Sequence, residues 1–577
     1  MARVLLVSTN ACRNRIGVRR LMPTDACRKV GSPSVPPAVR RQYMSPPPPA
    51  TAAPRLWGAI SLACLGALFV AIVATFQDYG ISWDEEVQNI YGTKLLAFYT
   101  SGFKDRGALS FMNLYFYGGF FDLVAAALNT VLPFGIYETR HLWGALFFLF
   151  GLVGAWKLAE LLAGPRAAAL AVLLLGVNAL MYGHGFINPK DAPFGWLSLW
   201  LIFFAGRAIL EGVPRTGTIL GFAVVAGLAL GTRILSAPLI GYVFCAMILG
   251  AILKRFNFQL ATPVGRIALA FGAALPLVYA VMALCWPWAV QAPFNPIVAL
   301  HEFANFPWTG DILWNGKMVS ANDLPRSYLL LLLGVQLSEA ILLGLAFAVC
   351  AGFAAFLRDG FSLLDHPKLL PLSILIAAAV VPLAGFMILT PTIYNGLRHF
   401  LFVIPPLGIV AALGWNWAFA VAAARGRAFS AITALVLAAV FIPQIVTMVR
   451  MHPYQYIAYN MLIGGLPGAA GRFELDYWDT SLRDAGAMLA DRIAKAGEGP
   501  PQVFVCGNQV SAMTKLPPGS RHTFKVEEAD YLMSIEPSPC GYIADVTRNR
   551  ILQIRREGVV LSYVIDLRAQ RAGANSE

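Results

Sequence analysis

Long uncharged apolar runs constrain this chain more than any other feature. The runs 59–76 and 169–183 contain no charged residue. A helix that spans the hydrocarbon core of a bilayer needs roughly 20 apolar residues, and lipid forces the backbone into helices because unpaired amides find no water there. Hydrophobic residues make up 58% of the chain and charged residues 13%, whereas soluble domains have about 45–50% and about 25%. The sequence therefore predicts an all-α polytopic membrane protein.

Eleven spans of suitable length can be placed, with polar joints between them. They are 57–77, 140–163, 167–183, 193–210, 216–232, 234–253, 266–286, 327–357, 369–390, 399–422 and 428–448. Basic residues recur in alternate joints, at Lys157, Arg166, Arg207, Arg215, Lys254, Arg255, Arg266, Arg358, Lys368, Arg425 and Arg427. Because basic joints face the cytoplasm, the pattern predicts an inner-membrane protein with its N-terminus inside and its C-terminus outside.

The apolar segment 114–134 is interrupted by Gly118, Gly119, Asp122 and Pro133. A full crossing there would put every later joint on the wrong side for the charge rule. We therefore expect a helix that lies in the membrane interface, within the large outer joint 78–139.

The two ends of the chain differ in composition from the middle. The net charge is +13, and ten basic residues precede the first span against one acid. A nucleic-acid arm is one interpretation, but the position before a span favours a cytoplasmic anchor, and no nucleic-acid partner is expected. Residues 1–56 are predicted to be a disordered, Pro-rich tail and 57–449 the membrane domain. Segment 450–577 predicts a small α/β domain outside, with strands near 503–506 and 559–567 and a helix near 480–496.

Acids and bases gather on the same face in separate outer joints. The first contains Asp84, Glu85 and Glu86 directly after a span. A solvated helix start, with Ser82 as its N-cap, explains such acids, since acids favour the first turn. The alternative is a carboxylate that acts as general base on an acceptor hydroxyl or holds a divalent ion.

The second joint places His184, Asn188, Lys190 and Asp191 in a short turn between two apolar spans. Such residues can be simple polar punctuation, because Asn-Pro favours a turn. The functional interpretation is a second carboxylate converging with Asp84, beside a lysine that binds phosphate. A tentative metal site would use Asp84 and Asp191.

Arg398 and His399 enter a span at its outer end, and Arg233 occupies a very short outer joint. An arginine in such a place either extends its side chain to the interface or binds an anion bidentately. The sequence contains no Walker loop, GxGxxG, GxSxG or HExxH motif.

Four further strings belong with these residues: Gly164-Pro165-Arg166, Val403-Ile404-Pro405-Pro406, His452-Pro453-Tyr454-Gln455-Tyr456 and Glu474-Leu475-Asp476-Tyr477-Trp478. With them, the chain resembles the GT-C membrane glycosyltransferases over most of residues 57–480. The likeness is to bacterial members of the dolichyl-phosphate-mannose protein mannosyltransferase group (family 39) and to the aminoarabinose transferases. The resemblance implies transfer of a sugar from a polyprenyl-phosphate donor to a lipid, glycan or protein acceptor on the outer face.

By the same resemblance, Asp84, Glu85 and Asp191 would be catalytic acids. Lys190 and Arg398 would bind the donor phosphate. On their position alone, His399 and Arg233 are further candidates for binding it, and His184 and Asn188 are candidates for the rest of the cavity. The joint 287–326 is too short for the β-trefoil insert of eukaryotic protein mannosyltransferases, which favours a lipid or envelope-glycan acceptor. Two other interpretations stay open: a secondary transporter or lipid flippase, and a membrane scaffold whose outer acids are dispensable.

Overall fold

The computed structural model describes residues 53–253, 263–304, 308–540 and 550–568. Residues 53–577 form one compact unit, distinct from residues 1–52. The predicted tail 1–56 therefore lies almost wholly outside the described residues, and so do Lys254 and Arg255 of one basic joint.

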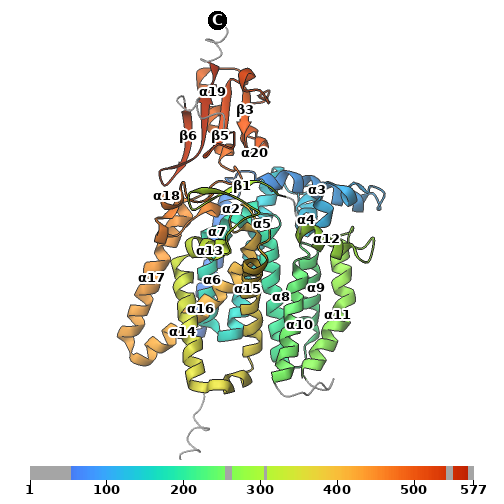
Figure 1. Ribbon diagram of the computed structural model, residues 1–577, viewed down its shortest axis with the longest axis vertical. Helices are drawn as coiled ribbons and strands as arrows, with labels where there is room; N and C mark the ends of the chain where they lie inside the picture. The colour runs from blue at the N-terminus through green and yellow to red at the C-terminus, as the bar shows by residue number, and fades with distance from the viewer. Residues whose placement is uncertain (1–52, 254–262, 305–307, 541–549, 569–577) are drawn as a thin grey trace, which may run out of the picture. The chain divides into compact units, whose positions relative to one another are not determined.

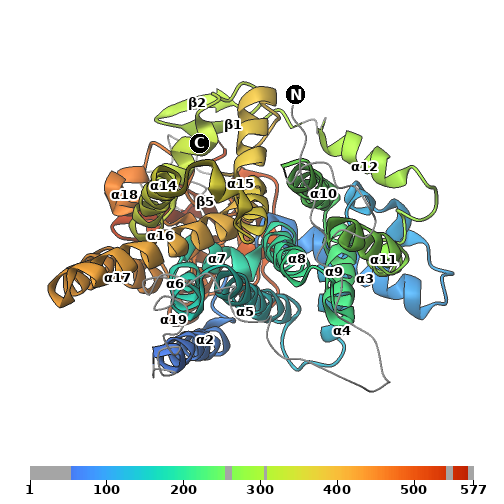
Figure 2. The same ribbon diagram turned by 90° about the horizontal axis from the view of Figure 1, so that it is seen from below.

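Apolar helices lie side by side and make up most of the described chain (Figures 1 and 2). In chain order they are α2 (Ala53–Thr75), α5 (Ile136–Ala163), α6 (Pro165–Gly176), α7 (Ala179–Ile187), α8 (Asp191–Glu211), α9 (Thr216–Leu230), α10 (Ser236–Leu253), α11 (Pro263–Cys285), α13 (Tyr328–Gln336), α14 (Glu339–Asp359), α15 (Leu369–Leu389), α16 (Ile404–Arg425) and α17 (Arg427–Arg450). By length and composition, 8 of the described helices could cross a membrane, or 9 if the bent pair α6–α7 is one span. The predicted spans 216–232 and 234–253 fall on the shorter apolar helices α9 and α10. The all-α membrane fold is confirmed, and the number of crossings stays a prediction.

The predicted span 167–183 is a broken helix, so the expectation of a continuous one is wrong. Helices α6 and α7 meet at 64°. At the break, the side chain of Asn178 accepts a hydrogen bond from the backbone N–H of Met181 at 3.0 Å and thereby caps α7. The mean hydropathy of a window of residues is hardly changed by a single polar capping residue, although such a residue favours the start of a new helix.

The predicted span 327–357 is broken as well, between α13 and α14. Ser338 caps α14 through its hydroxyl. The amide of Asn460, which follows α17 (Arg427–Arg450), donates to the carbonyls of Gly334 at 2.7 Å and Leu337 at 2.9 Å. These carbonyls end a helix and have no partner within it, so the distant asparagine stabilises the break. No local sequence pattern predicts that contact.

Segment 114–134 contains no helix long enough to cross a bilayer. It holds η2 (Leu114–Phe116) and α4 (Phe120–Leu128), whose 9 residues extend about 13 Å against a core of about 30 Å. A Cβ at Gly118 would overlap the carbonyl of Gly231, and the N–H of Phe120 donates to the Gly231 carbonyl at 3.1 Å. The glycine therefore serves close packing on the joint between α9 and α10. The interfacial position of α4 stays a prediction.

Further elements gather at the end of the bundle where α4 lies (Figure 1). They are α3 (Trp83–Thr100), η1 (Gly107–Ser110), α12 (Asn295–Ala304), the antiparallel hairpin of β1 (Asp311–Trp314) and β2 (Lys317–Ser320), and η4 (Arg398–Val403). Helix α3 begins in a capping box, in which Ser82 and Glu85 satisfy one another's backbone donors. The opposite end of the bundle carries η3 (Gly360–Asp365).

After α17 the chain passes through η5 (Gln455–Ile457), η6 (Met461–Ile463) and α18 (Gly465–Ala469) into a five-stranded sheet of order β4-β3-β5-β7-β6. Its strands are β3 (Gln502–Cys506), β4 (Arg521–His522), β5 (Tyr531–Ile535), β6 (Arg550–Arg556) and β7 (Val559–Asp566), and its helices are α19 (Leu482–Ala496) and α20 (Gln509–Met513), with η7 (Val526–Glu528) between β4 and β5. Strand β3 is parallel to β4 and β5, and β7 is antiparallel to β5 and β6. The predicted α/β composition is confirmed, and a disulfide joins Cys506 to Cys540.

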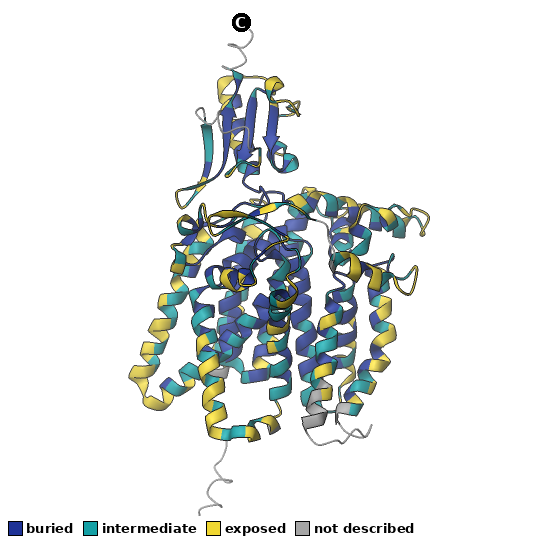
Figure 3. Cartoon of the chain, in the orientation of Figure 1, coloured by how far each residue is buried: buried dark blue, intermediate teal, exposed yellow. Residues whose placement is uncertain are grey.

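Burial follows the position of each helix in the bundle (Figure 3). Helices α6, α7 and α8 are buried along most of their length, whereas α17 has one buried residue, Gln444. Residues Tyr454, Tyr456 and Trp478 belong to the same apolar core as these central helices. The segment that follows α17 is thus packed on the membrane part, and the division at residue 450 stays a proposal.

Candidate active site

A cavity of about 120 Å³ lies where the outer joints meet. Its lining combines carboxylates, cations and tyrosines from five stretches of chain: Asp84, Val87, Asn113, Leu114, Tyr117, Lys190, Asp191, Arg233, Tyr394, Arg398 and His399. Six of the nine residues proposed from the sequence therefore meet at one point. The three that do not line the cavity are Glu85, His184 and Asn188.

Asp84 stands in the first turn of α3, one residue after the exposed Trp83. Its Oδ2 accepts a hydrogen bond from Arg398 Nη1 at 2.9 Å and lies 3.5 Å from Lys190 Nζ. Burial acts to raise the pKa of this carboxyl, but the two cations outweigh it and hold the pKa below its ordinary value. Asp84 is therefore an ionised acceptor in the cavity wall.

Glu85 faces away from the cavity and is buried. Its Oε2 accepts from the backbone N–H of Ser82 at 2.8 Å, and its Oε1 lies 3.0 Å from His141 Nε2. One carboxylate thus closes the capping box of α3 and pairs with an imidazole on α5. Its geometry is that of a helix cap, and the catalytic role inferred from the resemblance stays a prediction.

Asp191 begins α8 and forms a buried ion pair with Arg233. Asn188 holds the acid in place: its Oδ1 accepts from the backbone N–H of Asp191 at 2.8 Å, and its Nδ2 donates to Asp191 Oδ2 at 3.3 Å. The Asn-Pro turn predicted from the sequence therefore aims the carboxylate at the arginine. Asn188 supports the cavity from behind its wall.

His184 also lies behind the wall. Its Nδ1 is 3.3 Å from Asn188 Nδ2, and its Nε2 is 3.1 Å from the hydroxyl of Tyr477. The imidazole therefore connects the turn that carries Asp191 to the segment after α17.

Arg398 is buried between two rings, with its Cζ 4.6 Å from the centroid of Tyr394 and 5.5 Å from that of Trp478. In the described part of the chain, Arg398 Nε and His399 Nδ1 are buried without a hydrogen-bond partner. Buried polar atoms are nearly always satisfied, so two such atoms beside one cavity point to a polar ligand there.

Two tyrosines were missed by the sequence reasoning. The ring of Tyr117 lies 4.8 Å from Lys190 Nζ and 5.9 Å from Arg233 Cζ, so that it faces both cations. Tyr394 lies four residues before Arg398, in the stretch from which the sequence predicts Arg398 and His399. Tyr117 could not be selected from the sequence, because nothing in segment 114–134 predicts that this ring meets Lys190 and Arg233.

The charges in the wall favour an anion. Lys190, Arg233 and Arg398 supply three cations against the two carboxylates Asp84 and Asp191, which leaves one positive charge in excess. A divalent ion between the two carboxylates would displace their present partners and sit among these cations. Among the described residues no group of three or more His, Cys, Asp or Glu could hold a metal ion. Each of the two carboxylates already has a cationic partner, and the predicted divalent ion stays a prediction.

The cavity is small. Ligand pockets usually measure about 300–1,000 Å³, so a space of about 120 Å³ suits the charged head of a ligand and not the whole of it.

No protein-family model and no curated protein matches the chain. Among solved structures, it is similar to the apo structure of ArnT from Cupriavidus metallidurans, with 16% identity, 89% of this chain and 98% of that chain covered, and a TM-score of 0.45. A second structure of that protein is bound to undecaprenyl phosphate (16% identity, the same coverage, TM-score 0.42). The chain is also similar to AglB from Archaeoglobus fulgidus, an oligosaccharyltransferase solved with an inhibitory peptide and a dolichol-phosphate, at 11% identity, with 82% of this chain and 69% of that chain covered and a TM-score of 0.46. Both are GT-C glycosyltransferases, the group that the sequence resembles. Sequence identities this low indicate a similar fold alone.

Proposed function

We propose that this protein is a membrane glycosyltransferase, which transfers a sugar from a polyprenyl-phosphate donor to an acceptor hydroxyl on the outer face of the cytoplasmic membrane. One observation carries the proposal: a carboxylate at a helix start, Asp84, shares a small cavity with Lys190, Arg233 and Arg398. Such a wall can hold a phosphate and an acceptor hydroxyl side by side. A lipid or envelope-glycan acceptor is favoured over a protein.

In the proposed reaction, the acceptor oxygen forms a bond to the anomeric carbon while the bond from that carbon to the phosphate oxygen breaks. The polyprenyl phosphate leaves with the electron pair, and the acceptor proton passes to Asp84. Arg398 offers the donor phosphate a planar fork, and Lys190 a point charge. Charge that develops on the departing phosphate is stabilised by donors already in place, and no step is routed through a metal.

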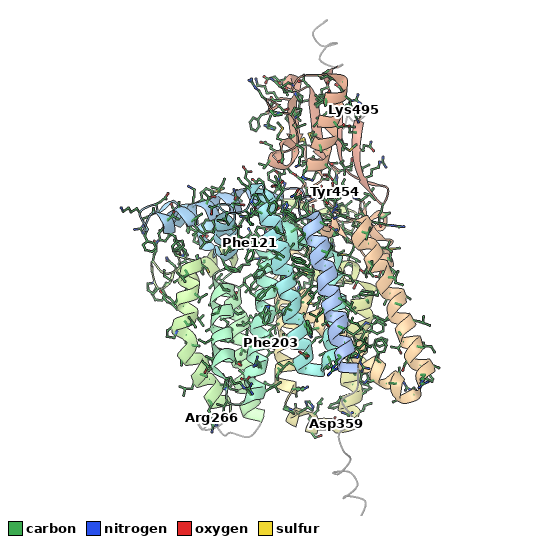
Figure 4. The ribbon with its side chains drawn as sticks, turned by 180° about the vertical axis from the view of Figure 1, so that it is seen from behind. Phe121, Phe203, Arg266, Asp359, Tyr454 and Lys495 are labelled. Carbon is green, nitrogen blue, oxygen red and sulfur yellow. A yellow bond between two sulfur atoms is a disulfide. The ribbon has the colours of Figure 1, made fainter. Side chains whose placement is uncertain are left out.

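The orientation of the site follows from charge and redox arguments. Arg266 and Asp359 lie at one end of the bundle, while Phe121 and Tyr454 lie toward the other end (Figure 4). The cavity belongs to this second end, because its wall includes residues of α3, which packs on α4. The described basic joints are on the Arg266 side, which the charge rule assigns to the cytoplasm. The disulfide Cys506–Cys540 belongs to the opposite side, where an oxidising compartment would preserve it.

A transporter or flippase would place its charged site near the middle of the membrane, at broken helices. Here neither the bent pair α6–α7 nor the broken pair α13–α14 contributes a residue to the cavity wall. The charges that line the cavity come from joints and helix ends. This arrangement favours the enzyme over the transporter.

The test is a transfer assay with the purified chain in lipid, a panel of radiolabelled polyprenyl-phosphate sugars and an envelope extract as acceptor. We expect Asp84→Asn to fold and to lose roughly 10²–10⁴-fold in rate, the usual contribution of a positioned base. Glu86→Gln is the matched control, because Glu86 is an exposed acid in the same turn of α3. Near wild-type transfer by Asp84→Asn would remove Asp84 from the reaction, and binding of carrier without transfer by any variant would favour the flippase.

A further inference from the structure

The joint that leads to Asp84 is held by residues nearly 400 positions later in the chain. Arg483 donates to the carbonyls of Gln77 at 2.5 Å and Asp78 at 2.8 Å. Further along, the hydroxyl of Tyr79 donates to Gln455 Oε1 at 3.1 Å. The joint therefore has its backbone and one ring fixed by the segment that follows α17.

Further contacts with the segment after α17 follow along the joint up to the start of α3. A Cβ at Gly80 would overlap the carbonyl of Thr480, so the two backbones touch. Asn508, at the start of α20, donates from its Nδ2 to the carbonyl of Ile81 at 3.1 Å. The α/β part of the chain thus contacts the residues just ahead of Asp84.

The six residues Glu474–Asp479 contact the other two joints of the site as well. Glu474 accepts hydrogen bonds from the backbone of Asn395 and Gly396, in the turn before Arg398. Tyr477 meets His184 at 3.1 Å, and the ring of the fully buried Trp478 lies 5.5 Å from Arg398 Cζ. One short stretch therefore contacts three of the joints that build the cavity.

Asp479 makes the contact nearest to Asp84. Its Oδ2 accepts from Trp83 Nε1 at 2.8 Å and from the backbone N–H of Asn508 at 2.9 Å. A Cβ at Gly507 would lie 2.7 Å from this oxygen, so the carboxyl fills a space that only glycine leaves open. Burial, and then Asp476, raise the pKa of Asp479 to about 8. An amide at this position would accept the same two hydrogen bonds.

We propose that Glu474–Asp479 is a positioning segment that holds three joints of the active site in register, and that Asp479 fixes Trp83 and through it the place of Asp84. The expected change in kcat rests on the proposed function, whereas the hold of Asp479 on the joint can be measured without a transfer assay. Misplacing a reacting group by about 1 Å can cost on the order of 10²-fold in rate, so a segment that touches no substrate can still control kcat.

Four variants of the full-length chain test this. Trp83→Phe removes only the indole N–H, and Asp479→Gly removes the acceptor while suiting the backbone, since Asp479 has φ +58°. Asp479→Asn is the conservative variant, because asparagine tolerates this conformation and keeps an accepting oxygen. Trp200→Phe is the matched control: its indole also donates one hydrogen bond, to the carbonyl of Phe150 at 3.0 Å, outside the site.

Two measurements are made on each variant. Hydrogen exchange of peptides covering 77–92 reads the joint directly, and kcat and KM are measured with the donor that the wild type accepts. We expect faster exchange in this stretch, kcat lower by about 10–100-fold and KM within about threefold for Trp83→Phe and Asp479→Gly. Asp479→Asn and Trp200→Phe should match the wild type in both.

Unchanged exchange in Trp83→Phe and Asp479→Gly would overturn the inference, and so would faster exchange with unchanged kcat. A loss in KM alone would also overturn it, because the segment would then act on donor binding. If the wild type transfers no sugar, the proposed function fails by itself, and the exchange measurement still decides whether Asp479 holds the joint.

Discussion

The buried ion pair between Asp191 and Arg233 allows a prediction whose size follows from the structure. The side chains are 5% and 10% exposed, and they form an ion pair with one another. Removing one member of a buried pair leaves an uncompensated charge, which typically costs about 3–5 kcal/mol, whereas replacing both members is close to neutral. Arg233→Met should therefore lower the free energy of unfolding by about 3–5 kcal/mol.

The second variant, Asp191→Asn combined with Arg233→Met, removes both charges. Asparagine keeps an oxygen that accepts from the Asn188 amide, whose Nδ2 lies 3.3 Å from Asp191 Oδ2. We expect the double variant to regain at least about 2 kcal/mol of the loss, which corresponds to a coupling on the order of 30-fold in the unfolding equilibrium. The net charge of the cavity is the same in the wild type and in the double variant.

The assay is unfolding in mixed micelles by titration with a denaturing detergent, followed by circular dichroism. If Arg233→Met alone is as stable as the wild type, or if the double variant is no more stable than Arg233→Met, the pair is solvated and the charge balance described here is wrong. The stable double variant also separates two roles of Asp191. Retained transfer would make this acid a counterion for Arg233, and lost transfer would make it a catalytic group.

Three more outcomes follow from the site. Lys190 lowers the pKa of Asp84, so the carboxylate stays ionised as the pH falls. Lys190→Met should raise that pKa, and the acid limb of the pH profile of kcat/KM should then move to higher pH. An unmoved limb would contradict the pairing of Lys190 with Asp84. Glu85→Ala should lower the free energy of unfolding by about 1–3 kcal/mol, because the buried N–H of Ser82 loses its acceptor. Glu85→Gln should keep this hydrogen bond and a transfer rate within about threefold of the wild type. A large loss of transfer in Glu85→Gln would support a catalytic role for Glu85. Chelation with EDTA should change transfer by less than about twofold, since each cavity carboxylate already holds a cationic side chain, and restoration of a lost activity by added Mg²⁺ or Mn²⁺ would refute this.

Hydropathy and charge patterns were enough to predict the helical part of the fold. The apolar runs predict helices because lipid leaves the backbone no other choice, and every predicted span has a helix at its place. The breaks inside 167–183 and 327–357 could not be predicted in the same way. They depend on Asn178, Ser338 and Asn460, single polar residues whose effect depends on which carbonyls they meet in the folded chain.

The site was predictable in its charged members and not in their pairing. Acids and bases on outer joints stand out against an apolar background, so Asp84, Lys190 and Arg398 could be selected from the sequence. Which acid faces the cavity depends on the helix phase: Glu85, next to Asp84, turns toward the cap and His141. The contribution of Trp478 could not be foreseen either, because its contact with Arg398 joins residues far apart in the sequence.

Under the proposed function, the pairing of Asp84 would make proton transfer depend on a bound donor. Buried cations without counterions would cost several kcal/mol each, so an empty site needs Asp84 as the partner of Arg398 and Lys190. In that state the carboxylate is a poor base, because the same two cations lower its pKa. A donor phosphate that draws Arg398 and Lys190 to itself would withdraw them from Asp84, and burial would then raise the pKa of the carboxyl. Asp84 would thus become a better base only when the donor is in place, which protects the empty site from charge imbalance and couples proton transfer to occupancy.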